Sequence, residues 1–200
     1  MSSTVPPAIP EGTMANAVQP RVPIDDELAL RPWEHRDAPA VLAAFRDPDI
    51  IRWHTRRMTA LDEAATWIET NIAAWTSERS SSWAVVDVSN EHVLGRTALH
   101  TQLADGTAEI AYWVLPDARG RGVATRAAIA ATTWGHEFGF HRIELQHSTR
   151  NHPSCLVALR AGFVAEGVKR SSDRHADGPH DMHLHAHIST DDPAAAAPVH

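Results

Sequence analysis

Residues Asp117 to Phe138 read DARGRGVATRAAIAATTWGHEF, a basic, glycine-containing turn that is followed directly by a run of helix-forming residues. The first N–H groups of a helix have no partner inside the helix, and the aligned peptide dipoles add partial positive charge at that end. Gly120 and Gly122 permit an anion to approach the backbone closely, and Arg119 and Arg121 carry charge that attracts phosphate. The stretch therefore indicates either a pyrophosphate-binding loop or an ordinary surface turn before a helix.

The composition of the whole chain is typical of a soluble globular protein. The chain has 200 residues, of which 43% are hydrophobic and 22% charged, and this suits one domain with a sizeable core. We find no apolar run long enough to span a membrane and no secretion signal, so we expect a cytoplasmic protein without a membrane partner. The net charge of −7 argues against nucleic acid as a partner. The single cysteine, Cys155, permits no internal disulfide.

Both ends of the chain differ in composition from its centre. Residues 1–23 are rich in proline, serine and alanine and have little apolar periodicity, and residues 190–200 have the same character. We therefore predict a disordered tail over residues 1–23, one domain over residues 24–189, and a second disordered tail over residues 190–200.

The apolar pattern of the central region predicts an α+β domain. Strands are expected at residues 27–33, 82–88, 92–100, 107–115, 142–147, 163–170 and 180–188, and helices at 37–46, 61–78, 123–138 and 151–161. Turn signals at Ser89-Asn90 and at Asp105-Gly106 join three of the strands into an antiparallel meander. A strand, the basic loop, a helix and another strand then follow one another at the middle of the domain.

The loop is similar to a known cofactor signature. The P-loop pattern and the spaced glycines of dinucleotide folds are absent. What remains is Arg119-x-x-Gly122-x-Ala124, which lies between an apolar strand and an alanine-rich helix. This pattern resembles the acetyl-CoA signature of the GCN5-related N-acetyltransferase (GNAT) superfamily.

The resemblance extends from about Leu28 to Ile188. The stretches AEIAYWVLPDARGRGVATRA (108–127), FHRIELQHSTRNHPSCLVALRAGFVAEG (140–167) and LALRPWEHRDAPAVLAAFRDPDIIRWH (28–54) resemble the branch named for the acetyltransferases RimJ and RimL. This resemblance implies the GNAT fold, a mixed, mostly antiparallel, twisted sheet of about six to seven strands flanked by about four helices.

The resemblance also implies where acetyl-CoA binds. The pyrophosphate would lie on the N–H groups of the loop and the helix start, and the pantetheine arm would pair with the backbone of the preceding strand. Asn151 and Ser154 would meet the cofactor from the following helix, unless they only cap that helix. The expected cofactor-binding residues are Trp113, Val114, Leu115, Arg119, Gly120, Arg121, Gly122, Val123, Ala124, Thr125, Asn151 and Ser154.

Transfer of an acetyl group to an amine requires a neutral amine, a donor for the developing oxyanion and a proton for the leaving thiolate. The family attacks directly, without an acyl-enzyme. Glu109 lies on the strand before the loop and is the expected base, and the alternative is an ordinary cross-strand charge.

The proton donor is not assigned by the sequence. Many members of the superfamily carry a tyrosine acid seven residues after the position of Asn151, and here that position is Ala158. Ser154 and Ser148 are the candidates that remain, and Tyr112 is expected to be a core residue rather than an acid.

Two other features could carry chemistry. Cys155 has no evident base beside it and is expected to be a spectator. His183, His185 and His187 share one face of a strand, but the sequence places no cysteine or carboxylate near them at ligand spacing. We therefore expect a half-exposed strand face and no metal.

These observations favour an acetyl-CoA-dependent N-acetyltransferase whose acceptor is a primary amine, either a protein N-terminus or a small molecule. We expect a monomer or a homodimer. Two alternatives stay open: a CoA-binding module without catalysis, because Ala111 replaces a frequent glycine, and an aminoglycoside-modifying enzyme, which would need a strongly acidic acceptor cleft. Acceptor choice is expected to depend on the variable region from Pro48 to Leu61.

Overall fold

The structure is a computed structural model, and it describes residues 5–54 and 56–191. The elements are β1 (Val22–Pro23), β2 (Leu28–Pro32), η1 (His35–Asp37), α1 (Ala38–Ala44), α2 (Pro48–Trp53), α3 (Leu61–Thr76), β3 (Ser80–Asp87), β4 (Val93–Gln102), β5 (Thr107–Val114), η2 (Pro116–Ala118), α4 (Val123–Phe138), β6 (Arg142–Ser148), α5 (His152–Arg160), β7 (Val164–His175) and β8 (Gly178–Ile188).

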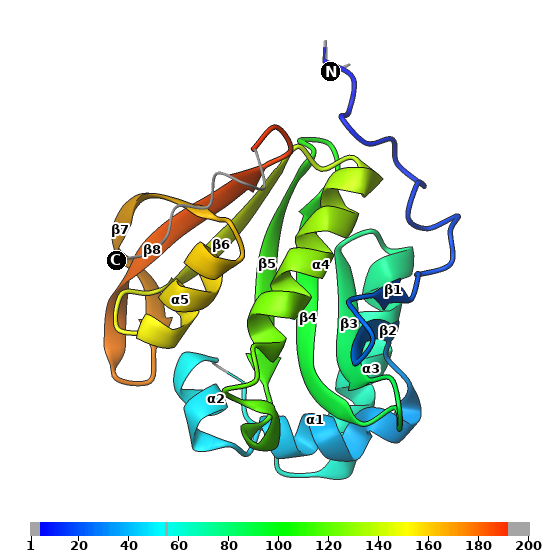
Figure 1. Ribbon diagram of the computed structural model, residues 1–200, viewed down its shortest axis with the longest axis vertical. Helices are drawn as coiled ribbons and strands as arrows, with labels where there is room; N and C mark the ends of the chain where they lie inside the picture. The colour runs from blue at the N-terminus through cyan, green and yellow to red at the C-terminus, as the bar shows by residue number, and fades with distance from the viewer. Residues whose placement is uncertain (1–4, 55, 192–200) are drawn as a thin grey trace.

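The strands form one mixed sheet in the order β1-β2-β3-β4-β5-β6-β8-β7 (Figure 1). The pairing of β5 with β6 is parallel, and the other neighbouring pairs are antiparallel. The α+β architecture with a mostly antiparallel sheet is therefore confirmed. The two-residue strand β1 and the six-residue helix α2 were not expected, because elements of this length have no measurable periodicity.

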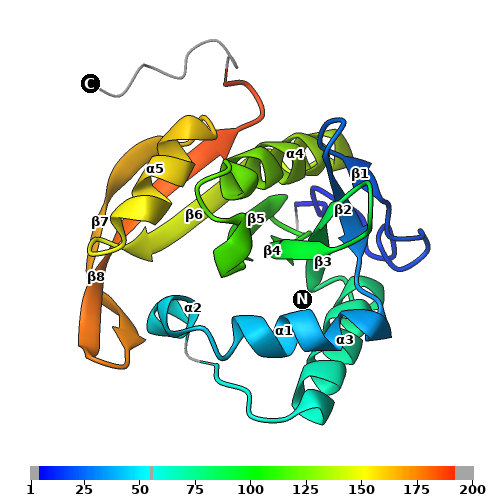
Figure 2. The same ribbon diagram turned by 60° about the horizontal axis from the view of Figure 1, so that its bottom comes forward.

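Helices cover both faces of the sheet (Figure 2). One core lies between the sheet and α4, and it contains Ile110, Ala127 and Ile143. The other lies under α1 and α3, where Trp113 packs with Trp67. Alternate residues of β5 therefore enter different cores, as expected for a strand covered on both faces. In the described part of the chain, no helix is long and apolar enough to cross a membrane.

The two central strands separate along their length. β5 and β6 pair only at their first residues, from Thr107 opposite Arg142 to Glu109 opposite Glu144. Beyond Glu109 they diverge, and Figure 1 shows β6 turning away from β5 toward the β7–β8 hairpin. The second half of β5 therefore has one edge without a neighbouring strand, which leaves backbone N–H donors available to a ligand.

The N-terminal segment differs from the disordered tail expected over residues 1–23. Ile9 and Met14 are buried, with 4% and 0% of their surface exposed. The backbone N–H groups of Gly12 and Met14 donate to the Glu78 carboxylate at 2.8 and 2.7 Å. Two apolar anchors and a carboxylate hold this segment without any periodic pattern. Residues 1–4, and the predicted C-terminal tail from residue 192 on, lie outside the described residues.

Candidate active site

A cleft of about 1010 Å³ opens where β5 and β6 diverge. Its walls come from the separated parts of these strands, the starts of α4 and α5, helix α2 and the end of β7. The charged side chains in its lining are Asp49, Glu109, Asp173, Arg52, Arg119, Arg150 and Arg160. Among the described residues, carboxylates thus do not outnumber guanidinium groups in the lining, and the cleft is not strongly acidic.

The open edge of β5 presents alternate backbone groups to the cleft. The N–H of Leu115 donates to the Leu94 carbonyl at 2.9 Å, on the side of β4. In an antiparallel ladder, the backbone groups of every second residue point to the same side. The backbone groups of Trp113 therefore also point to β4, whereas those of Tyr112 and Val114 point to the cleft. Of the three residues expected to pair with pantetheine, Val114 is the one whose backbone lies on the open edge.

The basic loop brings the start of α4 to the same cleft. Gly120 and Gly122 have φ values of 75° and 72°, a left-handed conformation that glycine adopts without strain. The N–H of Arg126 donates to the Gly122 carbonyl at 3.0 Å, and this is the first bond of the helix. The N–H groups of Val123, Ala124 and Thr125 precede that bond, so helix geometry leaves them available to an anion.

The two arginines of the loop differ in their environment. Arg119 donates to Asp49 at 2.8 Å and also forms an ion pair with Asp47, and its Nε donates to the Val114 carbonyl at 3.3 Å. Its side chain therefore joins the loop to α2 and is not directed to a phosphate. Arg121 is exposed and remains the candidate for such a contact.

Asn151 and Ser154 lie at the start of α5, on the opposite wall. The Ser154 N–H donates to Asn151 Oδ1 at 3.3 Å, so Asn151 caps the helix, as the alternative interpretation held. The Ser154 hydroxyl lies 2.6 Å from the hydroxyl of Tyr112, which connects the two walls of the cleft.

Tyr112 has a second role that sequence reasoning missed. Its ring packs against the α4 core, as expected, but its hydroxyl reaches the cleft. Desolvation raises the pKa of Tyr112 from 10.0 to about 12, although the hydrogen bond with Ser154 opposes this shift. The phenol is therefore protonated at neutral pH and can donate a hydrogen bond. In the sequence, the position of Tyr112 on the strand that leads into the basic loop is the signal that could have indicated a role in the cleft.

Glu109 lies where β5 and β6 begin to separate. Removal of water by the surrounding protein raises the pKa of its carboxyl group, and the nearby Glu144 raises it further. Gln146 Nε2 donates to Glu109 Oε2 at 3.2 Å, and Lys169 Nζ donates to Gln146 Oε1 at 3.1 Å. The side chain is exposed and accepts one hydrogen bond from Gln146, and the upward direction of its pKa shift suits a general base.

The far end of the cleft is formed by α2 and the β7–β8 hairpin. The ring of Trp53 contacts those of His175 and His180, with centroids 5.9 and 6.4 Å apart, and Figure 2 shows α2 facing the hairpin. His54, the next residue, interacts with the backbone of Tyr112, and desolvation lowers its pKa to about 4. These aromatic groups form a wall that a second substrate would meet.

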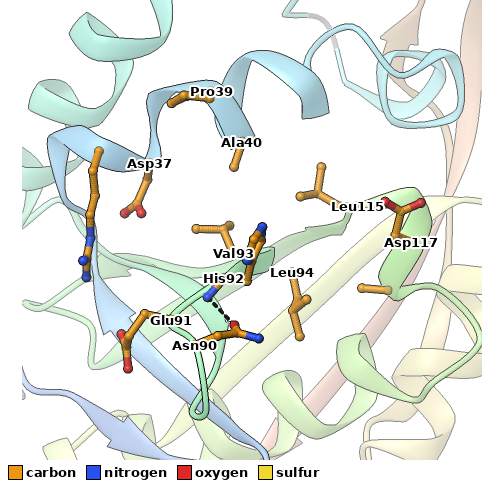
Figure 3. Close-up of a pocket in the computed structure, with 12 residues that line it drawn as sticks. Asp37, Pro39, Ala40, Asn90, Glu91, His92, Val93, Leu94, Leu115 and Asp117 are labelled. Carbon is orange, nitrogen blue, oxygen red and sulfur yellow. Dashed lines mark hydrogen bonds between the residues drawn. The ribbon is translucent and has the colours of Figure 1, made fainter.

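A smaller cavity of about 470 Å³ lies between the start of α1 and the β3–β4 turn (Figure 3). Two of its polar side chains are engaged within the protein. Asp37 pairs with Arg31 at 2.9 Å, and Asn90 Oδ1 accepts the N–H of His92 at 2.8 Å, which is the dashed line in Figure 3. We therefore place the functional site in the larger cleft.

Comparison with known proteins gives a family match and one curated relative. The model of the acetyltransferase (GNAT) domain matches residues 27–164. The uncharacterized N-acetyltransferase YoaA of Bacillus subtilis (strain 168) is 26% identical over 164 residues, which cover 80% of this chain and 93% of that protein.

Solved structures share the fold. A GNAT-family acetyltransferase from Bacillus anthracis superposes with a TM-score of 0.77 at 21% identity, covering 86% of this chain and 100% of the other. The ribosomal L7/L12 α-N-protein acetyltransferase RimL, solved with coenzyme A, superposes with a TM-score of 0.78 at 19% identity, covering 84% of this chain and 98% of the other.

Proposed function

Because the chain belongs to the acetyltransferase (GNAT) family and is an acetyl-CoA-dependent acyltransferase, we propose that it acetylates a primary amine in the cleft between β5 and β6. The observation that carries this proposal is the open edge of β5 beside the start of α4. An amide-bearing arm and a pyrophosphate need these two features at adjacent places. The family makes the chain an enzyme, so a module without catalysis is not proposed.

The cofactor binds along β5 in this proposal. Its pyrophosphate lies on the N–H groups from Gly120 to Thr125, with Arg121 adding charge. A pantetheine carbonyl accepts from the open-edge N–H of Val114, in the manner of an added strand, while the Val114 carbonyl accepts from Arg119. The role of Arg119 is to hold the loop against α2, which its bonds to Asp47 and Asp49 support.

Glu109 acts as the base and accepts a proton from the incoming ammonium group, directly or through water. Its raised pKa supports this role, because a carboxylate with an ordinary pKa is a weaker base. The neutral amine attacks the thioester carbonyl directly. The N–H of Tyr112 on the open edge is the donor that we assign to the developing oxyanion.

Ser154 protonates the departing thiolate and is itself hydrogen-bonded to Tyr112. The 2.6 Å contact between their hydroxyl groups supports a short proton path across the cleft. This pair takes the place of the tyrosine that many relatives carry where this chain has Ala158, which is buried. The thiol of CoA and the N-acetylated amine are the products.

The acceptor enters from the side of α2 and the β7–β8 hairpin. We propose either the α-amino group of a protein or a small primary amine, as RimL is named for the first of these. Asp173 and Glu109 can attract an ammonium group there. No feature of the described lining favours an aminoglycoside, which would need a strongly acidic cleft.

Thiol release from acetyl-CoA tests this function. The full chain is incubated with peptides that have free α-amino groups, with small primary amines, and with the same peptides after N-acetylation. We expect release to depend on a free amine, with the acetyl group found on it by mass spectrometry. Absence of amine-dependent release across both classes would contradict the proposal.

A further inference from the structure

Four ligand-type side chains meet beneath α5. They are His147 on β6, Cys155 on α5, and His183 and His185 on β8, and one ligand atom from each lies within 4.8 Å of the others. Sequence analysis singled out His183 and His185 but expected no metal, because the two further ligands, His147 and Cys155, come from other elements.

The sheet register brings the imidazole groups together. His147 pairs with His183, and Leu145 pairs with His185, so the three rings share the face that α5 covers. The ring centroid of His147 lies 5.2 Å from that of His183 and 5.1 Å from that of His185. His187 lies on the same face but is bonded to His136 at 3.0 Å and does not join the group.

The protonation state of His147 suits a metal ligand. Its Nδ1 lies 2.8 Å from the Ser148 carbonyl, which can only accept, so Nδ1 carries the hydrogen and the lone pair of Nε2 accepts a hydrogen bond from Nε2 of His185, whose hydrogen a metal ion would displace. Nε2 of His147 lies 3.1 Å from Nε2 of His185. Two nitrogens bound tetrahedrally to one zinc ion are about 3.3 Å apart, so this pair needs little adjustment.

The group also contains polar atoms without partners. Among the described residues, Nδ1 of His183 and Nδ1 of His185 are buried and have no hydrogen-bond partner. An unpartnered buried nitrogen is costly, so a metal ion on Nδ1 of His183 would remove one such cost, whereas Nδ1 of His185 stays unpartnered when that ring binds through Nε2. His147 and His185 are buried, with 4% and 1% of their surface exposed, so water does not compete for these nitrogens.

We propose that His147, Cys155, His183 and His185 bind one zinc ion through three imidazole nitrogens and one thiolate. This donor set and the tetrahedral spacing suit Zn²⁺. The ion is structural, and acetyl transfer does not pass through it. It joins α5, which carries Asn151 and Ser154 at its start, to β6 and β8. Zinc therefore stabilises one wall of the cofactor cleft.

Cobalt substitution tests the site directly. The full chain without an affinity tag is treated with a chelator, freed of it, and titrated with Co²⁺. We expect one equivalent to produce the visible bands of tetrahedral cobalt together with a thiolate-to-cobalt charge-transfer band, and Zn²⁺ to displace both. Zinc in excess is expected to raise Tm by about 5 °C or more.

Matched variants separate this site from adventitious binding. Cys155→Ala should abolish the charge-transfer band and weaken zinc binding at least about 10²-fold, while circular dichroism shows a folded chain. His187→Ala, on the same strand face but outside the group, should bind as the unchanged chain does. The proposal is overturned if Co²⁺ gives no thiolate band in the folded wild-type chain, or if both variants weaken binding equally.

Discussion

Glu109 and Tyr112 carry the chemistry of the proposed reaction, and they point to opposite faces of β5. Side chains alternate along a strand, so the sequence alone places Ile110 and Trp113 on opposite faces of β5. The structure agrees, because Ile110 enters one core and Trp113 the other. The contact between Tyr112 and Ser154 was not predictable in the same way. These residues are 42 positions apart, and their contact depends on the angle at which β6 leaves β5.

Tyr112→Phe keeps the ring in the core and removes the hydroxyl that bonds Ser154. We expect kcat to fall by about 10²-fold, because the thiolate leaves without its proton path, while KM for acetyl-CoA stays close to the wild-type value. Steady-state thiol release measures both values. Ser154→Ala should lower kcat similarly, and an unchanged kcat in both variants would remove this pair from the mechanism.

Glu109→Gln keeps the shape and hydrogen bonding of the side chain and removes the base. Because the pKa of Glu109 is raised, the wild-type rate should fall as pH drops through that raised value, when the carboxylate takes up a proton. The variant should lack this pH limb and should lose about 10²-fold in kcat near neutral pH. The deficit should shrink at high pH, where the amine is already neutral. A deficit that is constant across pH would indicate a structural defect instead.

Short or irregular elements account for most of what sequence reasoning missed. The helix start at Gly122 was predictable, because glycine, charge and a helical pattern follow one another there. Helix α2 was not predictable, although Asp47 and Asp49 at its start bind Arg119 and so hold the basic loop before α4. The N-terminal segment has no periodic spacing of apolar residues. It is held by the Glu78 carboxylate and by the buried side chains of Ile9 and Met14.

Met14→Ala tests whether the N-terminal segment is part of the folded domain. Met14 is 0% exposed, so the loss of its side chain should lower the free energy of unfolding by about 2–5 kcal/mol. Denaturant unfolding measures the difference. Val18→Ala is the matched control, because Val18 is 92% exposed and should unfold as the wild type does. Equal stability of the two variants would show that the segment does not pack.

The molecule as a whole is a sheet covered on both faces whose central strands separate to form the larger cleft. The pattern of strands and helices could be predicted, because each has its own period and turn signals. The placement of β8 between β6 and β7 could not be predicted from the sequence. The group of His147, Cys155, His183 and His185 beneath α5 depends on this placement. Contacts that arise from strand order and register are long-range and leave no local pattern in the sequence.

The central claim is that the start of α4 binds the pyrophosphate of acetyl-CoA, and calorimetric titration of CoA into two variants of Gly122 tests it. A Cβ at this position meets only Arg126 Cδ, at 3.9 Å, so alanine and aspartate both fit the space, and because aspartate tolerates the left-handed backbone at least as well as alanine, strain does not disfavour Gly122→Asp relative to Gly122→Ala. We expect the aspartate variant to bind CoA about 10²-fold more weakly than the alanine variant, because its carboxylate repels the pyrophosphate. Equal CoA affinity of the two folded variants would contradict the claim.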